Sequence, residues 1–213
     1  MRRLLPFAAA FLALALAVSC GDDDNPADTG DPEPELPKTP AELITQFFRA
    51  AYASMDSAAY AALLDSAYVF VLYAAGVDPD DPNPWWDLGE EMKIAGHMFG
   101  GWYNDDGQKV ERIVLQMTER LNVVDNTPYP DKPEGEEWRK VTALIDLLVV
   151  VNDPDDVDGF INFVVASDQL FTVRPSRTDS TTWTVYKQVD QEPINKGTGT
   201  ENASWGAVKE MFR

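Results

Sequence analysis

The spacing of apolar residues after position 39 predicts two successive helices. In "TPAELITQFFRAAYASMD", apolar residues recur three or four positions apart and form one stripe along a helix, made of Ile44, Phe47, Phe48, Ala51 and Met55. Thr39, Pro40 and Glu42 have the pattern of a capping box at its start. Asp56 is expected to cap a second, short helix, which directs Tyr60, Leu63 and Leu64 inward.

A strand and a third helix are predicted next. The segment "SAYVFVLYAAG" is rich in β-branched and aromatic residues, as strands are. After the Pro-rich acidic loop "DPDDPNPWWD", a helix is expected from about Asp87 to Tyr103. Its predicted apolar stripe consists of Leu88, Met92, Ala95, Phe99 and Trp102.

The remainder of the chain predicts a series of long strands. "ERIVLQMTERLNV" alternates apolar and polar residues, so one of its faces should be in contact with water. "KVTALIDLLVVV" and "GFINFVVASDQLFTV" are apolar on both faces for much of their length, which favours central, covered strands. "TTWTVYKQVD" adds a further strand, and "SWGAVKEMF", with Ser204 as the candidate cap, predicts a short last helix.

This order of elements resembles the nuclear transport factor 2-like superfamily, also called cystatin-like or SnoaL-like. The local matches are "FFRAAYASMDSAAYAALLDSAYVFVL" and "WTVYKQVDQE" followed by "SWGAVKEMF", and the resemblance covers residues 39–213. It is similar in particular to bacterial lipoproteins of this superfamily. The resemblance implies an α+β cone, in which a strongly bent antiparallel sheet wraps around a long N-terminal helix and leaves a hollow at its wide end. This fold hosts enzymes, binding modules and assembly domains, so it implies no single activity.

The first 19 residues are predicted to be a lipoprotein signal peptide. Two arginines precede an apolar run that is short for a bilayer span. "LAVSC" resembles the lipobox of bacterial lipoproteins, with Val18 where that family usually has Leu. The resemblance implies lipidation of Cys20, and Gly21 after it favours sorting to the outer membrane, facing the periplasm or the cell surface. The alternative is an ordinary signal cut elsewhere, which would leave a soluble protein.

A tether is expected between the lipidated cysteine and the folded part. Residues 21–38, "GDDDNPADTGDPEPELPK", are almost free of apolar side chains and rich in Asp, Glu and Pro, so this segment should stay extended. The predicted organisation is therefore a signal peptide over 1–19, a lipidated cysteine with a disordered acidic tether over 20–38, and a cone domain over 39–213.

The charge and the composition exclude several functions. The net charge is −19, and loss of the two arginines of the signal peptide would change it to −21. Such a surface repels the phosphates of nucleic acids and anionic lipid headgroups. A single cysteine excludes an internal disulfide and a cysteine-based zinc site, and a single histidine weakens most metal and triad chemistries. We expect no nucleic-acid partner, no metal and no cofactor.

Asp146 is the strongest candidate for chemistry, although the pattern leaves its role open. It interrupts "ALIDLLVVV" and shares a strand face with Leu144 and Leu148. If that face lined the hollow, burial would favour the neutral carboxyl that an acid or base of this fold needs. The other interpretation is structural: a hydrogen bond, or an ion pair with an arginine such as Arg120.

Aromatic residues are the candidates for a ligand pocket. Together with Asp146, the predicted lining is Tyr52, Tyr60, Trp86 and Trp102, and Trp85 belongs to the same aromatic set. The alternative is that most of these rings are ordinary core. His97 falls opposite the apolar stripe of its helix, which predicts a solvated histidine rather than a base.

The steroid isomerases of this superfamily combine a Tyr donor with two acidic groups. Tyr52, Asp146 and Asp168 cannot be matched to that motif residue by residue. The sequence therefore favours a lipid-anchored cell-envelope protein whose cone binds a small apolar ligand or a partner protein without catalysis. The alternatives are an isomerase-like or hydrolase enzyme that uses Asp146, and a structural homodimer.

Overall fold

The computed structural model describes residues 36–73, 84–156, 159–194 and 201–213, which belong to one compact unit, Leu36–Arg213. This unit begins slightly before the predicted boundary at residue 39. The reason is Pro37, which is buried and whose carbonyl oxygen accepts a hydrogen bond from the N–H of Trp183 at 3.1 Å. The predicted signal peptide, Cys20 and nearly all of the predicted tether lie outside the described residues.

The first predicted helix is present as one helical run with a wide turn in its middle. It consists of α1 (Pro40–Glu42), a π-helical segment η1 (Leu43–Phe48) and α2 (Arg49–Ser54). The capping box is confirmed, because the Thr39 hydroxyl accepts from the Glu42 N–H and the Glu42 carboxylate accepts from the Thr39 N–H, both at 3.2 Å. The π turn rotates the buried face, so Leu43 and Tyr52 are buried while Phe47 and Met55 are only partly covered.

The second helix, α3 (Ser57–Leu63), begins as predicted. The Asp56 carboxylate accepts hydrogen bonds from the N–H groups of Ala58 and Ala59, at 3.0 and 2.9 Å. Tyr60 and Leu63 are buried on its inner side. The chain then enters the sheet directly at Leu64.

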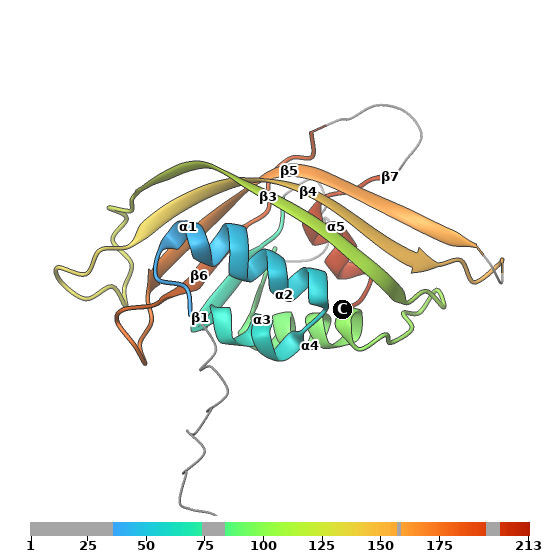
Figure 1. The fold of residues 1–213 in the computed structure, drawn as a ribbon, viewed down its shortest axis with the longest axis horizontal. Coiled ribbons are helices and arrows are strands. Elements are labelled where there is room, and N and C mark those ends of the chain that lie inside the picture. Colours follow the sequence, from blue (N-terminus) through green and yellow to red (C-terminus); the bar gives the residue numbers. More distant parts are fainter. Residues whose placement is uncertain (1–35, 74–83, 157–158, 195–200) are drawn as a thin grey trace, which may run out of the picture. The chain divides into compact units, whose positions relative to one another are not determined.

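The sheet curves around the helical run, as Figure 1 shows, and the predicted α+β class is confirmed. Its strands follow the order β2-β1-β6-β5-β4-β3, and a short seventh strand, β7, pairs with β5. The bounds are β1 (Leu64–Val71), β2 (Trp85–Asp87), β3 (Val110–Val124), β4 (Arg139–Asn152), β5 (Phe160–Pro175), β6 (Trp183–Val189) and β7 (Glu201–Asn202).

The sheet is antiparallel, as expected, except at two places. β1 runs parallel to β6, and β7 runs parallel to β5. The parallel pairing of β1 brings an early segment of the chain against a late one, which the order of the strands in the sequence does not reveal. β2 and β7 are short strands that the sequence pattern did not predict.

The long strands β3, β4 and β5 form the main wall of the domain. Their register pairs Leu115 with Leu147 and Leu147 with Val165, and all three side chains face the helices in the main core. We call this the inner face of the sheet. Residues one position along each strand point to the opposite, outer face.

The third helix, α4 (Leu88–Phe99), is capped by Asp87, whose carboxylate accepts from the Glu90 N–H at 3.1 Å. It ends before the predicted Tyr103, because Gly100 and Gly101 follow it. Its predicted apolar stripe is confirmed in part, because its residues pack against the core except Trp102, which is exposed. The fully buried side is formed by Glu91, Ile94, Ala95 and Met98, whereas Leu88, Met92 and Phe99 are only partly covered.

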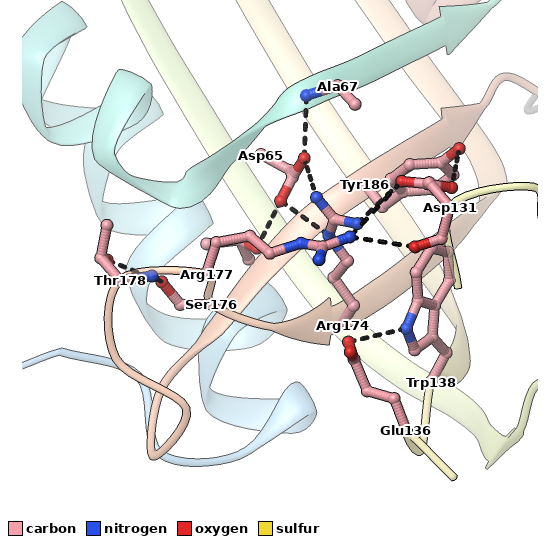
Figure 2. Close-up of polar contacts among 11 residues, drawn as sticks. Asp65, Ala67, Asp131, Glu136, Trp138, Arg174, Ser176, Arg177, Thr178 and Tyr186 are labelled. Carbon is pink, nitrogen blue, oxygen red and sulfur yellow. Dashed lines mark hydrogen bonds and ion pairs between the residues drawn. The ribbon is translucent and has the colours of Figure 1, made fainter. Parts of the chain in front are cut away.

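A cluster of side chains around Arg174, together with the β3–β4 loop, covers the outer face of the sheet at the end where β5 meets β6. There the side chain of Arg174 is almost fully buried, and its guanidinium forms two hydrogen bonds with Asp65 of β1, at 2.7 and 2.5 Å. A third hydrogen bond, at 2.9 Å, reaches Asp131 of the β3–β4 loop. The guanidinium also lies over the rings of Trp138 and Tyr186, at 5.3 and 5.2 Å from their centres (Figure 2).

This cluster around Arg174 fastens the β3–β4 loop to the sheet. Trp138 is fully buried but does not belong to the main core, because it packs on the outer face against Tyr129 and Tyr186. The Tyr186 hydroxyl donates to Asp131 at 3.0 Å, and Arg177 donates to the carbonyl oxygen of the same residue at 3.0 Å (Figure 2). Since each charge in the cluster has a partner, we interpret its role as structural: it holds the β3–β4 loop against the sheet.

We predict that Arg174→Met lowers the free energy of unfolding by about 3–5 kcal/mol, because it leaves the Asp65 carboxylate buried without its counter-charge. Arg177→Met is the matched control. Its side chain is half-exposed, so its loss should cost less than about 1 kcal/mol. Urea denaturation followed by tryptophan fluorescence measures both. Equal losses for the two variants would show that the buried ion pair does not hold the loop.

Candidate functional site

Three of the predicted pocket residues converge inside the cone. Tyr52, Tyr60 and Trp86 are all buried, and they surround the last helix, α5 (Trp205–Glu210). The N-terminus of α5 is capped by Ser204, as predicted, through a 3.1 Å hydrogen bond from the Ala207 N–H. These aromatic residues therefore gather at one place, as the sequence suggested, but the place is filled by the chain itself.

The aromatic rings pack edge to face rather than around an open space. The ring of Tyr52 has its centre 4.8 Å from Tyr60, 5.1 Å from Phe99 and 5.1 Å from Trp205. Trp86 stacks on Phe70, with ring centres 4.5 Å apart. Such distances are those of aromatic pairs in direct contact. Tyr52, Tyr60 and Trp86 are thus core residues.

A buried ion pair joins α4 to α5 at the centre of this cluster. The Lys209 ammonium lies 2.7 Å from Glu91 Oε1, and both side chains are fully buried. The Tyr60 hydroxyl donates to the same carboxylate oxygen at 2.6 Å, and the Trp86 indole N–H donates to Oε2 at 2.6 Å. Both oxygens of Glu91 are therefore satisfied.

Aromatic faces surround the ammonium of Lys209. It lies 4.1 Å from the centre of the Phe70 ring and 5.1 Å from that of Trp205. A cation over such rings is attracted by their negative faces, most strongly where water is excluded. Burial lowers the pKa of Lys209, while the neighbouring Glu91 carboxylate opposes this shift.

Burial also raises the pKa values of Tyr52, Tyr60 and Tyr68 well above the usual value of tyrosine, and the negative charge of Glu91 adds to each shift. These hydroxyls therefore stay neutral under all ordinary conditions. In this state the Tyr60 hydroxyl is a hydrogen-bond donor to the Glu91 side chain.

A second polar network closes the interior beside α5. The Asp190 carboxylate accepts from the Gly206 N–H at 2.8 Å and from the Gln169 amide at 2.5 Å. Gln169 in turn accepts from Gln188, which accepts from the Tyr68 hydroxyl. Gly206 is closely packed, because a Cβ atom there would collide with the end of the Leu72 side chain and lie 3.0 Å from Asp190 Oδ2. The network anchors the start of α5 to β5 and β6.

The candidate Asp146 lies elsewhere, and its predicted place in the hollow is wrong. Ile145 and Leu147 face the core, so Asp146 points to the outer face and is exposed. It does share that face with Leu144 and Leu148, as the pattern indicated, but this face is the outside of the cone. Arg120, its suggested partner, forms an ion pair with Asp168 at 3.1 Å.

Trp102 and Trp85 are also not part of the interior. Trp102 is 62% exposed and Trp85 is 48% exposed. Trp102 lies beyond the end of α4, where its ring stacks on His97 at 5.3 Å. His97 is half-buried rather than fully solvated, and its Nδ1 atom lies 2.9 Å from the carbonyl oxygen of Phe212.

The sequence interpretation missed the two charged residues at the centre of the site. Neither Glu91 nor Lys209 was among the residues that the sequence singled out. A signal existed for Lys209, since it follows Trp205 by four positions and therefore shares its helical face. Nothing local indicates that Glu91, 118 positions earlier, is its partner.

The described residues contain no group of three or more His, Cys, Asp or Glu side chains arranged to hold a metal ion. Within the same part of the chain, no helix has the length and apolar character needed to cross a bilayer.

No family model matches the chain, and no curated protein matches it. Similar solved structures include a conserved protein from Planctomyces limnophilus (12% identity, TM-score 0.45), a ketosteroid isomerase-like protein from Erwinia carotovora atroseptica (13%, 0.41) and a nuclear transport factor 2-like superfamily protein from Salmonella enterica serovar Typhimurium (12%, 0.43). The matches cover 70%, 71% and 72% of this chain and 90%, 95% and 88% of those chains, respectively.

We predict that Lys209→Met destabilises the protein by about 3–5 kcal/mol, because the Glu91 carboxylate then stays buried without a counter-charge. The double variant Lys209→Met/Glu91→Gln should recover a large part of this loss, since no net charge is then buried. Lys93→Met is the control, because Lys93 forms only an exposed i,i+3 pair, with a cost below about 1 kcal/mol. Chemical denaturation gives the three values. Additive losses in the double variant would contradict the pairing.

Proposed function

We propose that the protein is a lipid-anchored protein of the cell envelope whose cone domain is a non-catalytic binding module. The closed interior of the cone is the observation that supports the non-catalytic role. Glu91 and Lys209 inside the cone are fully buried and paired with each other, and the buried Asp190 carboxylate accepts hydrogen bonds from Gly206 and Gln169. A general acid or base must reach a substrate proton within hydrogen-bond distance. None of these groups has a position from which it meets a substrate.

The position of Asp146, the carboxylate proposed for the enzyme alternative, also argues against catalysis. Asp146 is exposed on the outer face of β4, with Gln116 and Ala166 opposite it on the neighbouring strands. A solvated carboxylate on an open sheet lacks the desolvated surroundings that tune an acid or base in enzymes of this fold. This placement favours binding over catalysis.

The closed interior also favours one of the two expected kinds of ligand. Trp205 and Val208 of α5 are buried in the main core, so the last helix takes up part of the interior of the cone. Of the two expected occupants, a partner protein at the surface is therefore favoured over an apolar molecule inside the cone.

Homodimer formation stays a prediction, and one surface supports it. Val114, Leu148 and Val164 lie side by side on β3, β4 and β5, where they form an apolar row across the outer face. Val114 is 39% exposed. A second copy packed on this row would remove it from water.

The lipid anchor is proposed from residues 1–38 and has a direct test. In cells that make the full chain, a radiolabelled fatty acid should be incorporated and the protein should sediment with the outer membrane. Cys20→Ala removes the thiol that carries the lipid, so both signals should be lost, whereas the control Ser19→Ala keeps the cysteine and a small residue before it. A Cys20→Ala protein that is still exported and membrane-bound would refute the anchor.

The non-catalytic role predicts that the full chain does not isomerise a Δ5-3-ketosteroid above the buffer rate, as followed by ultraviolet absorbance of the conjugated product. The informative comparison is between Asp146→Asn and Asp155→Asn, which remove one exposed carboxylate each. Turnover by the wild type that falls about 100-fold or more in the first variant only would reinstate the enzyme.

A further inference from the structure

Two surface hollows lie side by side at the ends of α4 and α5. One has a volume of about 240 Å³ and is lined by His97, residues 103–105 and residues 210–213. The other has a volume of about 250 Å³ and is lined by residues 85–87, Glu90 and Arg213. Arg213 belongs to both linings, so the two hollows adjoin at this residue. Pockets for whole drug-sized ligands begin at about 300 Å³, so each hollow suits a single side chain.

The chain itself shows which chemical group this surface recognises. The Arg213 guanidinium donates to Glu90 at 3.1 Å and to Glu210 at 3.0 Å, so a carboxylate from each helix holds it. It also lies over the ring of Trp86, 5.8 Å from its centre. Two carboxylates and an aromatic face are the partners that a guanidinium takes at a protein interface.

The free parts of the hollows offer the same chemistry. In the first hollow, Asp105 supplies a further exposed carboxylate, and the ring of Tyr103 is 66% exposed. The ammonium of Lys109 already lies over that ring at 5.7 Å. The carbonyl oxygen of Phe212 can only accept, so the neutral His97 ring carries its proton on Nδ1 and has an acceptor at Nε2.

The second hollow has a corresponding set of groups. Its wall includes the half-exposed ring of Trp85 and the carboxylates of Asp87 and Glu90. Acceptors and π-faces thus dominate both hollows, and among the described residues that line them the only lysine or arginine is Arg213. The net charge of −19 adds a long-range attraction for basic partners.

We propose that this surface binds a basic segment of a partner protein, with one arginine or lysine side chain in each hollow. This inference rests on the proposed binding function and names the chemistry of its partner. Arg213 is an intramolecular competitor in this arrangement, because it occupies the carboxylates that an incoming guanidinium would use. Its side chain is about one-third exposed, so it can leave without disturbing the core.

The test uses the full chain in a neutral detergent and a labelled peptide, Gly-Arg-Gly-Arg-Gly, followed by fluorescence anisotropy. The same peptide with citrulline in place of arginine has nearly the same shape without the charge. The affinity for the arginine peptide should be about tenfold or more higher than that for the citrulline peptide, and added salt should lower it. Equal binding of the two peptides, or no binding of either, would overturn the proposal.

Variants separate this site from general attraction to an acidic protein. The double variant Glu90→Gln/Glu210→Gln should lower the affinity for the arginine peptide about tenfold or more. The control Glu119→Gln/Glu134→Gln makes the same change of charge elsewhere and should change that affinity less than about twofold. Asp105→Asn is a further test, because Asp105 is exposed and outside the core. Thermal unfolding checks that each variant is folded. Equal effects of the two pairs would contradict the site.

Arg213→Gln gives the most specific result. It frees the carboxylates of Glu90 and Glu210, so the affinity for the arginine peptide should rise about tenfold, while Arg112→Gln on β3 should change it less than about twofold. An unchanged affinity would show that Arg213 does not compete. If peptide binding fails while Cys20-dependent anchoring holds, the partner site is wrong and the proposed anchored module stands.

Discussion

The interior of this domain depends on one buried ion pair. Glu91 and Lys209 lie at the centre of the cone with no exposure to water, and a charge in such a place is tolerated only with a close partner and with its remaining hydrogen bonds satisfied. This requirement fixes α5 against α4 and directs the Tyr60 hydroxyl and the Trp86 indole toward the same carboxylate. The position of the last helix, and with it the closure of the cone, follows from that constraint.

Arg174 has a comparable role on the other side of the sheet. Its bonds to Asp65 and Asp131 join β1, β5 and the β3–β4 loop, whereas backbone pairing connects β1 to β5 only through β6. One buried pair thus holds the helices inside the cone, and the other holds a loop outside it. Between them the sheet is covered on its inner face and partly covered on its outer face, and the surface around Arg213 and the apolar row of β3–β5 are the places that we propose for partners.

Local chemistry in the sequence predicted much of the fold. The caps at Thr39, Asp56 and Ser204 were identifiable because a side-chain oxygen bonds the first free N–H groups of a helix wherever the helix lies. Alternation correctly grouped Asp146 with Leu144, but it indicates only which residues share a face, not whether that face is inside. The π turn at Leu43–Phe48 changed the helical period, and the pairing of Glu91 with Lys209 connects residues far apart in sequence, so local pattern could reveal neither.

The central claim, that the ion pair is sealed inside a filled cone, can be tested most directly by hydrogen exchange of the tryptophan indole groups in NMR spectra. The indole N–H of Trp86 donates to Glu91 and should exchange only when the whole domain unfolds. The exposed indoles of Trp85 and Trp102 should exchange at once and serve as internal references. Exchange of the Trp86 indole at a rate close to theirs would mean that water reaches Glu91, and the closed interior would be refuted.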